Sequence, residues 1–421
     1  MLLHKVARLG YLQLIVLAVI APAYLQYLWQ YTAPRIPLVF GQSPGIWSGF
    51  LLTGLALVFW VKYRWQVAGP WQLKLFLTLL GILWAWQIGL AYVHGDATNY
   101  GVWLYPIILG MIFLKCPSRE DVLRSVLFAA WLFTLLILVT RVFELQGLFV
   151  EATVSSDLLE FERENYWLPL SGSLGPDGRW VGPFFHNSQT GNVAAYLVVL
   201  GVALKRRSSP IFLVVGILAL LLTSSRTSMV AAVIGVGVAL LFGPYQRIHR
   251  IPPRLRVAIV SALATTAALI ALWFSPNLTG RDVYWSYYLD LWRSSPWTGV
   301  GVTGRGSGSE TFADVNGHNL VIDALGVYGA LAALLVLSII VVGLVLGALS
   351  VRSGEAIPIA LIVTYATIGT AQSDYNWTVV SVPWLMLLLP VLLAAATLMS
   401  KGEHPHLHGT ETAPNPEGLR T

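Results

Sequence analysis

Charged residues are scarce in this chain. They make up 11% of its 421 residues, whereas a soluble domain carries about 25%. Hydrophobic residues make up 56% of the chain and are collected in runs near 20 residues, bounded by charges, Gly, Pro or Asn. This pattern excludes an ordinary soluble domain and predicts an all-α polytopic membrane protein. We assign the net charge of +6 to inner loops rather than to nucleic-acid binding.

Cysteine is almost absent as well. Cys116 is the single one, so no disulfide can form within the chain and no thiol chemistry is indicated. The sequence also lacks CxxC, HExxH, GxSxG, Walker and Rossmann patterns. We therefore expect no metal and no cofactor, so that any phosphate charge would be met by arginine.

The hydrophobic runs predict about twelve transmembrane helices with both termini inside, and two large outer loops. Residues 1–143 hold helices one to five (about 10–29, 46–61, 71–93, 99–114 and 125–143), 144–188 form an acidic outer loop, and 189–274 hold helices six to nine (about 189–204, 211–223, 228–242 and 257–274). A second large outer loop with an amphipathic helix covers 275–317, helices ten to twelve occupy 318–399 (about 318–350, 356–371 and 378–399), and 400–421 form a disordered inner tail. The tenth is unusually long, so we expect it to tilt or to project beyond the bilayer. No internal repeat is visible.

Lysine is absent from the predicted outer face. In this orientation 18 Lys and Arg residues fall inside and 8 outside, as the positive-inside rule requires. All the lysines are inside: Lys5, Lys62, Lys74, Lys115, Lys205 and Lys401. The outer cations are all arginines: Arg35, Arg141, Arg163, Arg179, Arg226, Arg281, Arg293 and Arg305. The guanidinium groups of these arginines are planar and forked, and they lie on a face that is normally poor in positive charge. This pattern predicts a site for an anionic ligand.

Arg226 is the most informative of these arginines. It lies in a tight turn, 223–227, between two apolar runs. A charge so close to the hydrocarbon costs several kcal/mol unless it is paired or faces a wet cavity. The neighbouring hydroxyls favour an anion site, and the alternative is an arginine that snorkels to the interface.

Arg281 opens an aromatic run, 281–293, which is typical of an amphipathic helix lying on a membrane. It could bind phosphate, or it could simply pair with Asp282. Trp285 and Tyr288 within the run could stack on sugar rings.

Histidines occur at the ends of both large outer loops. His318 and Asn319 open the tenth predicted helix, where the positive end of the helix dipole disfavours the imidazolium form and leaves a ring able to accept a proton. The alternative is a capping or core histidine. His186 ends the first outer loop, shortly after Arg179, and could line the same cavity. Asp374, in the last outer turn, could orient a histidine, bind a sugar hydroxyl or only be solvated.

These motifs together resemble one known family. The turn 225–227, Arg281 followed by the run 296–301, and His318-Asn319 followed by Gly329 lie on a twelve-helix layout with a large outer loop before the histidine. In these features the chain resembles the O-antigen ligase family, in the superfamily that also holds O-antigen polymerases and protein O-oligosaccharyltransferases. The resemblance covers about 220–335, and the N-terminal half matches by hydropathy only.

The resemblance implies an inverting, metal-independent glycosyltransferase of lipopolysaccharide biosynthesis. Such an enzyme transfers O-polysaccharide from undecaprenyl pyrophosphate to a sugar hydroxyl of lipid A–core, at the periplasmic face of the Gram-negative inner membrane. Arg226 and Arg281, helped by Arg179, would bind the leaving pyrophosphate, and His318 would deprotonate or orient the acceptor hydroxyl. Asn319 becomes a further candidate for substrate contact.

Two alternatives stay open. Within the superfamily, an O-antigen polymerase or a protein O-oligosaccharyltransferase would differ mainly in its acceptor. A transporter or flippase for a lipid-linked glycan is an alternative of a different class. Transporters often show repeats and place charges near the membrane midplane, whereas here the charges gather at the outer boundary, which favours an enzyme.

Overall fold

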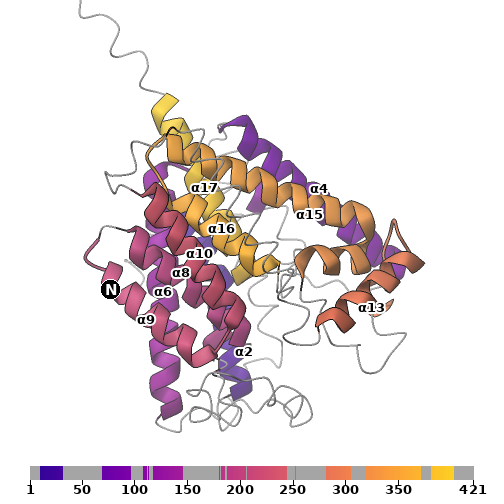
Figure 1. Ribbon diagram of the computed structural model, residues 1–421, viewed down its shortest axis with the longest axis horizontal. Helices are drawn as coiled ribbons and strands as arrows, with labels where there is room; N and C mark the ends of the chain where they lie inside the picture. Colours follow the sequence, from indigo (N-terminus) through magenta and orange to yellow (C-terminus); the bar gives the residue numbers. More distant parts are fainter. Residues whose placement is uncertain are drawn as a thin grey trace, which may run out of the picture.

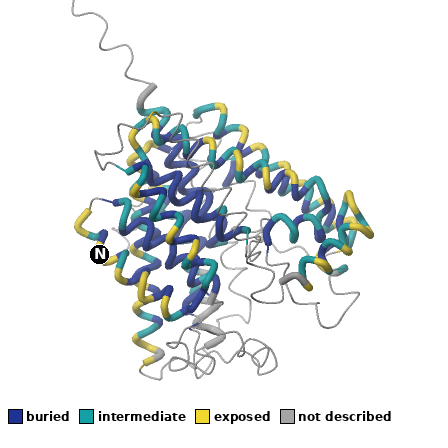
Figure 2. Tube along the Cα trace, in the orientation of Figure 1, coloured by how far each residue is buried: buried dark blue, intermediate teal, exposed yellow. Residues whose placement is uncertain are grey.

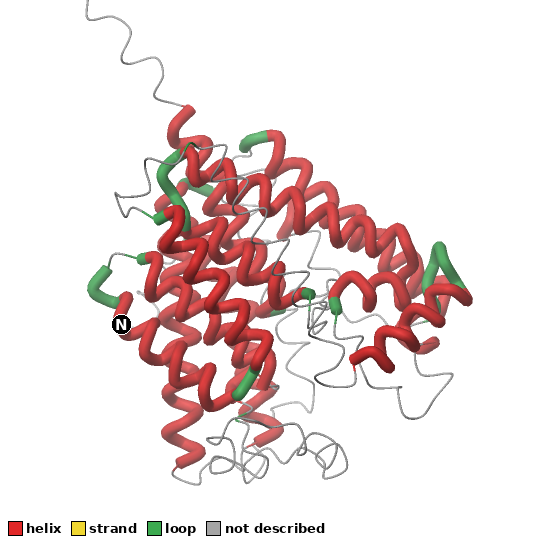
Figure 3. The backbone as a smooth tube through the Cα atoms, viewed as in Figure 1, coloured by secondary structure: helices red, strands yellow, loops and turns green. Residues whose placement is uncertain are grey.

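The computed structural model describes residues 10–31, 69–95, 108–110, 112, 117–145, 180, 182–184, 187–204, 206–243, 252, 281–304, 319–370 and 381–402. Every regular element within these ranges is a helix (Figure 3). In chain order they are α2 (Tyr11–Tyr31), α4 (Trp71–His94), α6 (Arg119–Leu145), the 3-10 helix η2 (Gly182–Phe184), α8 (Asn187–Ala203), α9 (Ser209–Thr223), α10 (Arg226–Phe242), α13 (Arg281–Ser294), α14 (Gly301–Gly304), α15 (Leu320–Arg352), α16 (Ile357–Gly369) and α17 (Val382–Gly402).

Nearly every predicted transmembrane helix that falls within these ranges coincides with an observed helix. The predicted helices 46–61 and 257–274 lie outside the described residues, and 99–114 is described only at 108–110 and 112. Four of the described helices, α4, α6, α15 and α17, are long and apolar enough to cross a membrane. The described part of the chain is thus all-helical and has membrane-spanning character. The first large outer loop, 144–188, falls mostly outside the described residues, as does the tail beyond residue 402, whereas the second, 275–317, is described at 281–304.

The helices are arranged around α8, α16 and α17, which are buried along almost their whole length (Figures 1 and 2). In the most apolar 18-residue stretch of α17, 89% of the residues are buried, whereas in the corresponding stretch of α4 33% are buried. Peripheral helices such as α9 expose large apolar side chains, including Val214 and Leu218. A surface that stays apolar outside the core suits contact with lipid.

Two contacts support the predicted up-and-down order of the helices. Arg119, at the start of α6, forms an ion pair with Glu355, just after α15. Asn319, just before α15, donates from Nδ2 to the carbonyl of Thr370 at the end of α16, at 2.9 Å. The first contact joins two ends predicted to be inside and the second joins two ends predicted to be outside.

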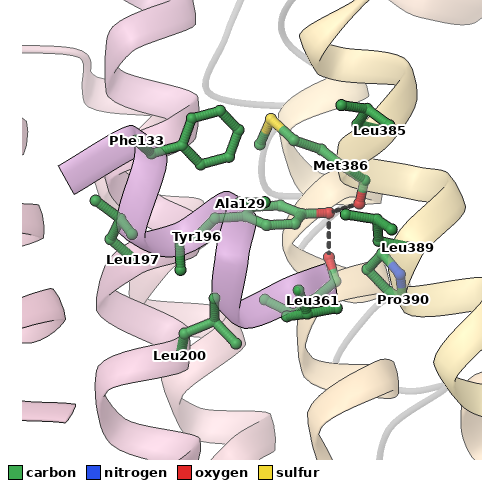
Figure 4. Close-up of a pocket in the computed structure, with 12 residues that line it drawn as sticks. Ala129, Phe133, Tyr196, Leu197, Leu200, Leu361, Leu385, Met386, Leu389 and Pro390 are labelled. Atoms are coloured by element: carbon green, nitrogen blue, oxygen red, sulfur yellow. Dashed lines mark hydrogen bonds between the residues drawn. The ribbon is translucent and has the colours of Figure 1, made fainter. Parts of the chain in front are cut away.

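A proline within α17 is compensated by a tyrosine from α8. Pro390 has no N–H, so the carbonyl of Met386, four residues earlier, has no helical partner. The hydroxyl of Tyr196 donates to this carbonyl, with the Leu361 carbonyl 3.1 Å away (Figure 4). The adjacent apolar cavity has a volume of about 20 Å³, so it holds no substrate-sized ligand.

Removing this hydroxyl is expected to destabilise the bundle. Tyr196→Phe leaves the Met386 carbonyl buried without its donor, which costs about 1–3 kcal/mol. The loss should appear as a lower melting temperature of the detergent-purified protein. Pro390→Ala restores the helical N–H, so Tyr196→Phe should cost much less in that background. An equal loss in both backgrounds would show that Tyr196 does not act through this carbonyl.

The longest helix, α15, is broken at Gly329. This glycine has φ 81° and ψ 179°, a conformation that is essentially restricted to glycine. The expectation of one long helix over 318–350 that tilts or projects beyond the bilayer is therefore wrong in one respect, because the helix is not continuous. Residues 330–352, which are enough to cross a bilayer, form one part, and residues 320–328, here called the arm, form the other.

The arm folds back along the bundle rather than continuing outward. A Cβ built on Gly347 would lie 3.0 Å from the Cα of Ile359, which fixes the level at which α15 and α16 meet. From there Gly369 is about 15 Å away along α16, whereas Leu320 would be about 40 Å away along a straight α15. Yet a Cβ on Gly369 would lie 3.3 Å from Leu320 Cδ2.

The break at Gly329 resolves this difference. The helix runs about 27 Å outward from Gly347 to Gly329, and the arm returns about 14 Å, which brings Leu320 to the level of Gly369. Figure 1 shows α15 extending beyond the other helices alongside α4, with α13 near its far end. The arm therefore carries its first residues back to the C-terminal end of α16.

Candidate functional site

The structure describes some of the predicted site residues and not others. Arg226, Asn319, Trp285 and Tyr288 are described, and for Arg281 the backbone at the start of α13 is described. Four further predicted residues lie outside the described residues: Arg179, His186, His318 and Asp374. Their proposed roles stay predictions.

Arg226 is the first residue of α10, after a sharp turn from α9. Ser224 ends α9 with a left-handed backbone, φ 50° and ψ 28°, and Ser225 is the N-cap of α10. An arginine at a helix start opposes the positive end of the helix dipole, which is unfavourable by about 0.3–1 kcal/mol. A bound anion would reverse this effect, because the guanidinium and the helix N-terminus both attract negative charge.

The serine before Arg226 leaves the backbone N–H groups of α10 uncapped by its side chain. Ser225 Oγ lies instead 2.7 Å from Ser228 Oγ, and Ser228 donates to Asn192 Oδ1 of α8, also at 2.7 Å. Gly191 permits this approach, since a Cβ there would lie 2.7 Å from Ser225 Cβ. The first N–H groups of a helix have no intrahelical partner, so they are suited to an anion.

Sequence patterns around Arg226 did not predict this polar support beneath it. Asn192 is 1% exposed and Ser228 is fully buried, so the pair is part of the packed interior. An asparagine inside an apolar membrane helix is costly unless it bonds to a partner. That signal, visible at Asn192, would have pointed to the α8–α10 contact.

The end of the first outer loop reaches the same corner. Trp180 is 4% exposed. Its backbone N–H donates to the carbonyl of Leu222, the residue before the last one of α9, at 2.9 Å. Arg179 precedes Trp180 in the sequence and lies outside the described residues. The position of Trp180 is compatible with the predicted helper role of Arg179.

Arg226 and Asn319 lie at the same end of the bundle. Gly235 of α10 packs directly on Thr364 of α16, and the two helices run in opposite directions (Figure 1). From this contact the start of α10 is about 14 Å away and Thr370 about 9 Å away, both toward the same end of the bundle. Packed helices are about 8–10 Å apart. Asn319 contacts Thr370, so the starts of α10 and of the arm converge.

Asn319 both caps the arm and ties it to α16. Its Oδ1 accepts hydrogen bonds from the N–H groups of Val321 at 3.0 Å and Ile322 at 3.1 Å. Its Nδ2 donates to the Thr370 carbonyl. Because its side chain is occupied in this way, Asn319 here acts as a structural cap at the edge of the site.

Replacing Asn319 is expected to loosen the arm. Asn319→Ala removes the cap and the tie to Thr370, which together are worth about 1–3 kcal/mol. Asn319→Asp keeps the cap and loses only the Nδ2 donor, so it should lower the stability less than Asn319→Ala does. Melting temperatures of the two purified variants test this order. Equal losses would mean that the cap contributes nothing to stability.

The aromatic residues of α13 face different environments. Tyr288 is 1% exposed, and its ring packs on Gly326 of the arm, where a Cβ would lie 2.7 Å from Tyr288 Cδ1. A ring covered in this way packs α13 against the arm, and stacking of Tyr288 on a sugar stays a prediction. Trp285 is half-buried, with Nε1 enclosed and without a hydrogen-bond partner among the described residues. Trp285 stays a candidate for substrate contact.

No family model matches the chain, and no curated protein matches it in sequence. The described residues contain no group of three His, Cys, Asp or Glu side chains that could hold a metal ion. The structure thus defines a helical membrane-type protein in which an arginine, several buried hydroxyls and two helix N-termini lie at the same end of the bundle.

Proposed function

We propose that this chain is a lipid-linked glycan transferase of the O-antigen ligase type. It would move O-polysaccharide from undecaprenyl pyrophosphate to a sugar hydroxyl of lipid A–core, at the periplasmic face of a Gram-negative inner membrane. The observation that carries the proposal is the convergence of Arg226, at the start of α10, with the start of the arm at Asn319. These are two of the motifs on which the resemblance rests.

The proposed chemistry needs an anion site at the outer boundary. The bond between the sugar's anomeric carbon and the pyrophosphate oxygen breaks while the acceptor oxygen attacks the opposite face. Negative charge grows on the leaving pyrophosphate, so preplaced donors such as the Arg226 fork and the N–H groups of α10 lower the barrier. The acceptor proton passes to His318, the residue before Asn319 in the sequence.

The acceptor decides between members of the proposed superfamily. Purified protein would be given undecaprenyl-pyrophosphate glycan with lipid A–core or with a second lipid-linked glycan, in separate reactions that contain EDTA. A product on lipid A–core supports the ligase, and a lengthened lipid-linked glycan supports the polymerase. If neither acceptor is glycosylated, with or without added divalent metal, both assignments fail.

A further inference from the structure

Two segments far apart in the sequence exchange their hydrogen bonds at the break in α15. In an unbroken helix the Gly326 carbonyl would accept from the N–H of Ala330. Here it accepts from Val300 at 3.1 Å, and Ala330 donates instead to the Pro296 carbonyl at 2.9 Å. Backbone groups of residues 296–300 and 326–330 therefore form hydrogen bonds with each other. We call this pair of segments the clasp.

Glycines allow the two backbones of the clasp to touch. Gly299 has φ 64°, and a Cβ on it would overlap the carbonyl of Val327. Gly329 has φ 81°, and a Cβ on it would overlap the carbonyl oxygen of Trp297. Each glycine is required twice, once by its left-handed backbone and once by the close approach of the other segment.

Side chains close the clasp on two sides. Trp86 of α4 donates from Nε1 to the Tyr328 carbonyl, the last carbonyl before the break, at 3.0 Å. Tyr288 of α13 packs into the space left by Gly326. The clasp thus fixes α13, α4 and the arm to one another at the far end of α15.

We infer that the clasp is the positioning device of the proposed active site, with Gly329 and Gly299 as its positioning residues. It holds the arm in its folded-back direction and so sets where Asn319 lies relative to Arg226. It also couples α13, which begins at Arg281, to the same arm. The positioning role rests on the proposed function, whereas the dependence of the fold-back on the clasp does not.

A disulfide can report the fold-back without any activity. A Cβ on Gly369 would lie 3.7 Å from Leu320 Cβ, within the range of a disulfide. In a Cys116→Ser background, Leu320→Cys with Gly369→Cys should cross-link on mild oxidation. The readout is the number of free thiols labelled by a maleimide–polyethylene glycol under denaturing conditions. A pair that stays reduced would overturn the fold-back.

The same cross-link tests the clasp. Gly329→Ala should slow cross-linking by about 5- to 150-fold. This factor is the fall in the population of the folded-back arm that corresponds to the strain energy of a non-glycine residue in this backbone conformation. Gly237→Ala in α10 is the matched control, since a Cβ there meets nothing within 4 Å, and its rate should be unchanged. If Gly329→Ala is not recovered as folded protein, Trp86→Phe takes its place, with an expected slowing of about fivefold. Unchanged rates in these clasp variants would overturn the clasp.

Rescue of turnover by the disulfide distinguishes a positioning role of the clasp from a contribution to protein stability alone. In Trp86→Phe, turnover should fall with little change in KM, and oxidising the 320–369 pair should restore it toward that of the cross-linked protein with an intact clasp. Reduction should remove the rescue. Turnover that stays low after cross-linking would contradict a positioning role. If no variant and no parent transfers glycan, the proposed function fails while the cross-linking rates still decide the clasp.

Discussion

Arg226→Lys is expected to lower the turnover of glycan transfer by about 10²–10³-fold, the loss that follows removal of one preplaced donor at a developing anion. Lysine keeps the positive charge at the start of α10 but loses the planar fork that binds two phosphate oxygens at once. Because the donor matters most when the pyrophosphate leaves, kcat should fall more than the apparent affinity for the lipid-linked donor changes. Steady-state kinetics with the purified variant measure both quantities.

Arg293→Lys is the matched control for this prediction. Arg293 is another predicted outer arginine, but its side chain is 69% exposed and it pairs with Asp290 three residues earlier, at 2.6 Å. An exposed pair of this kind contributes little, so this variant should keep its activity. If Arg226→Lys behaves like Arg293→Lys, Arg226 is only a charge at the membrane boundary.

His318→Ala is expected to lower transfer by about 10²–10⁴-fold, the usual contribution of a general base. The parent protein should also lose activity on the acid side of its pH profile, where an imidazole gains a proton. The variant's residual activity should not show that decline, because the titrating base is gone. Initial rates across a pH series, with saturating donor and acceptor, test both statements.

His94→Ala is the control for the histidine. His94 ends α4, a helix end predicted to be outer, and it has no role in the proposed chemistry. Its substitution should leave the pH profile as it is. A normal rate in His318→Ala, or an acid-side decline that persists in that variant, would assign His318 to capping or packing instead.

Local sequence signals predicted the helices and several of their ends. The turn 223–227, the start of α13 at Arg281 and the helix opened by Asn319 occur where charge, hydroxyl and aromatic patterns indicated them. Helix periodicity and capping are local, so they can be followed along the chain. The described contacts also join helix ends that were predicted to lie on the same side of the membrane.

The arrangement of the site could not be predicted in the same way. Hydropathy predicted one long helix over 318–350, because a glycine within an apolar run does not indicate that the chain reverses its direction there. The break at Gly329 depends on Pro296 and Val300, about thirty residues earlier, which supply the hydrogen bonds that the helix loses. Likewise, the buried contact between Asn192 and Ser228 joins two helices, so neither sequence segment predicts it alone.

The most direct test measures lipid movement and glycan transfer in one sample. Purified protein in liposomes would receive undecaprenyl-pyrophosphate glycan and lipid A–core, with EDTA present, beside the Arg226→Lys variant. The account predicts glycosylated lipid A–core from the parent protein and almost none from the variant. Movement of the lipid-linked glycan across the bilayer, with no glycosylated product from the parent protein, would contradict it and indicate a transporter.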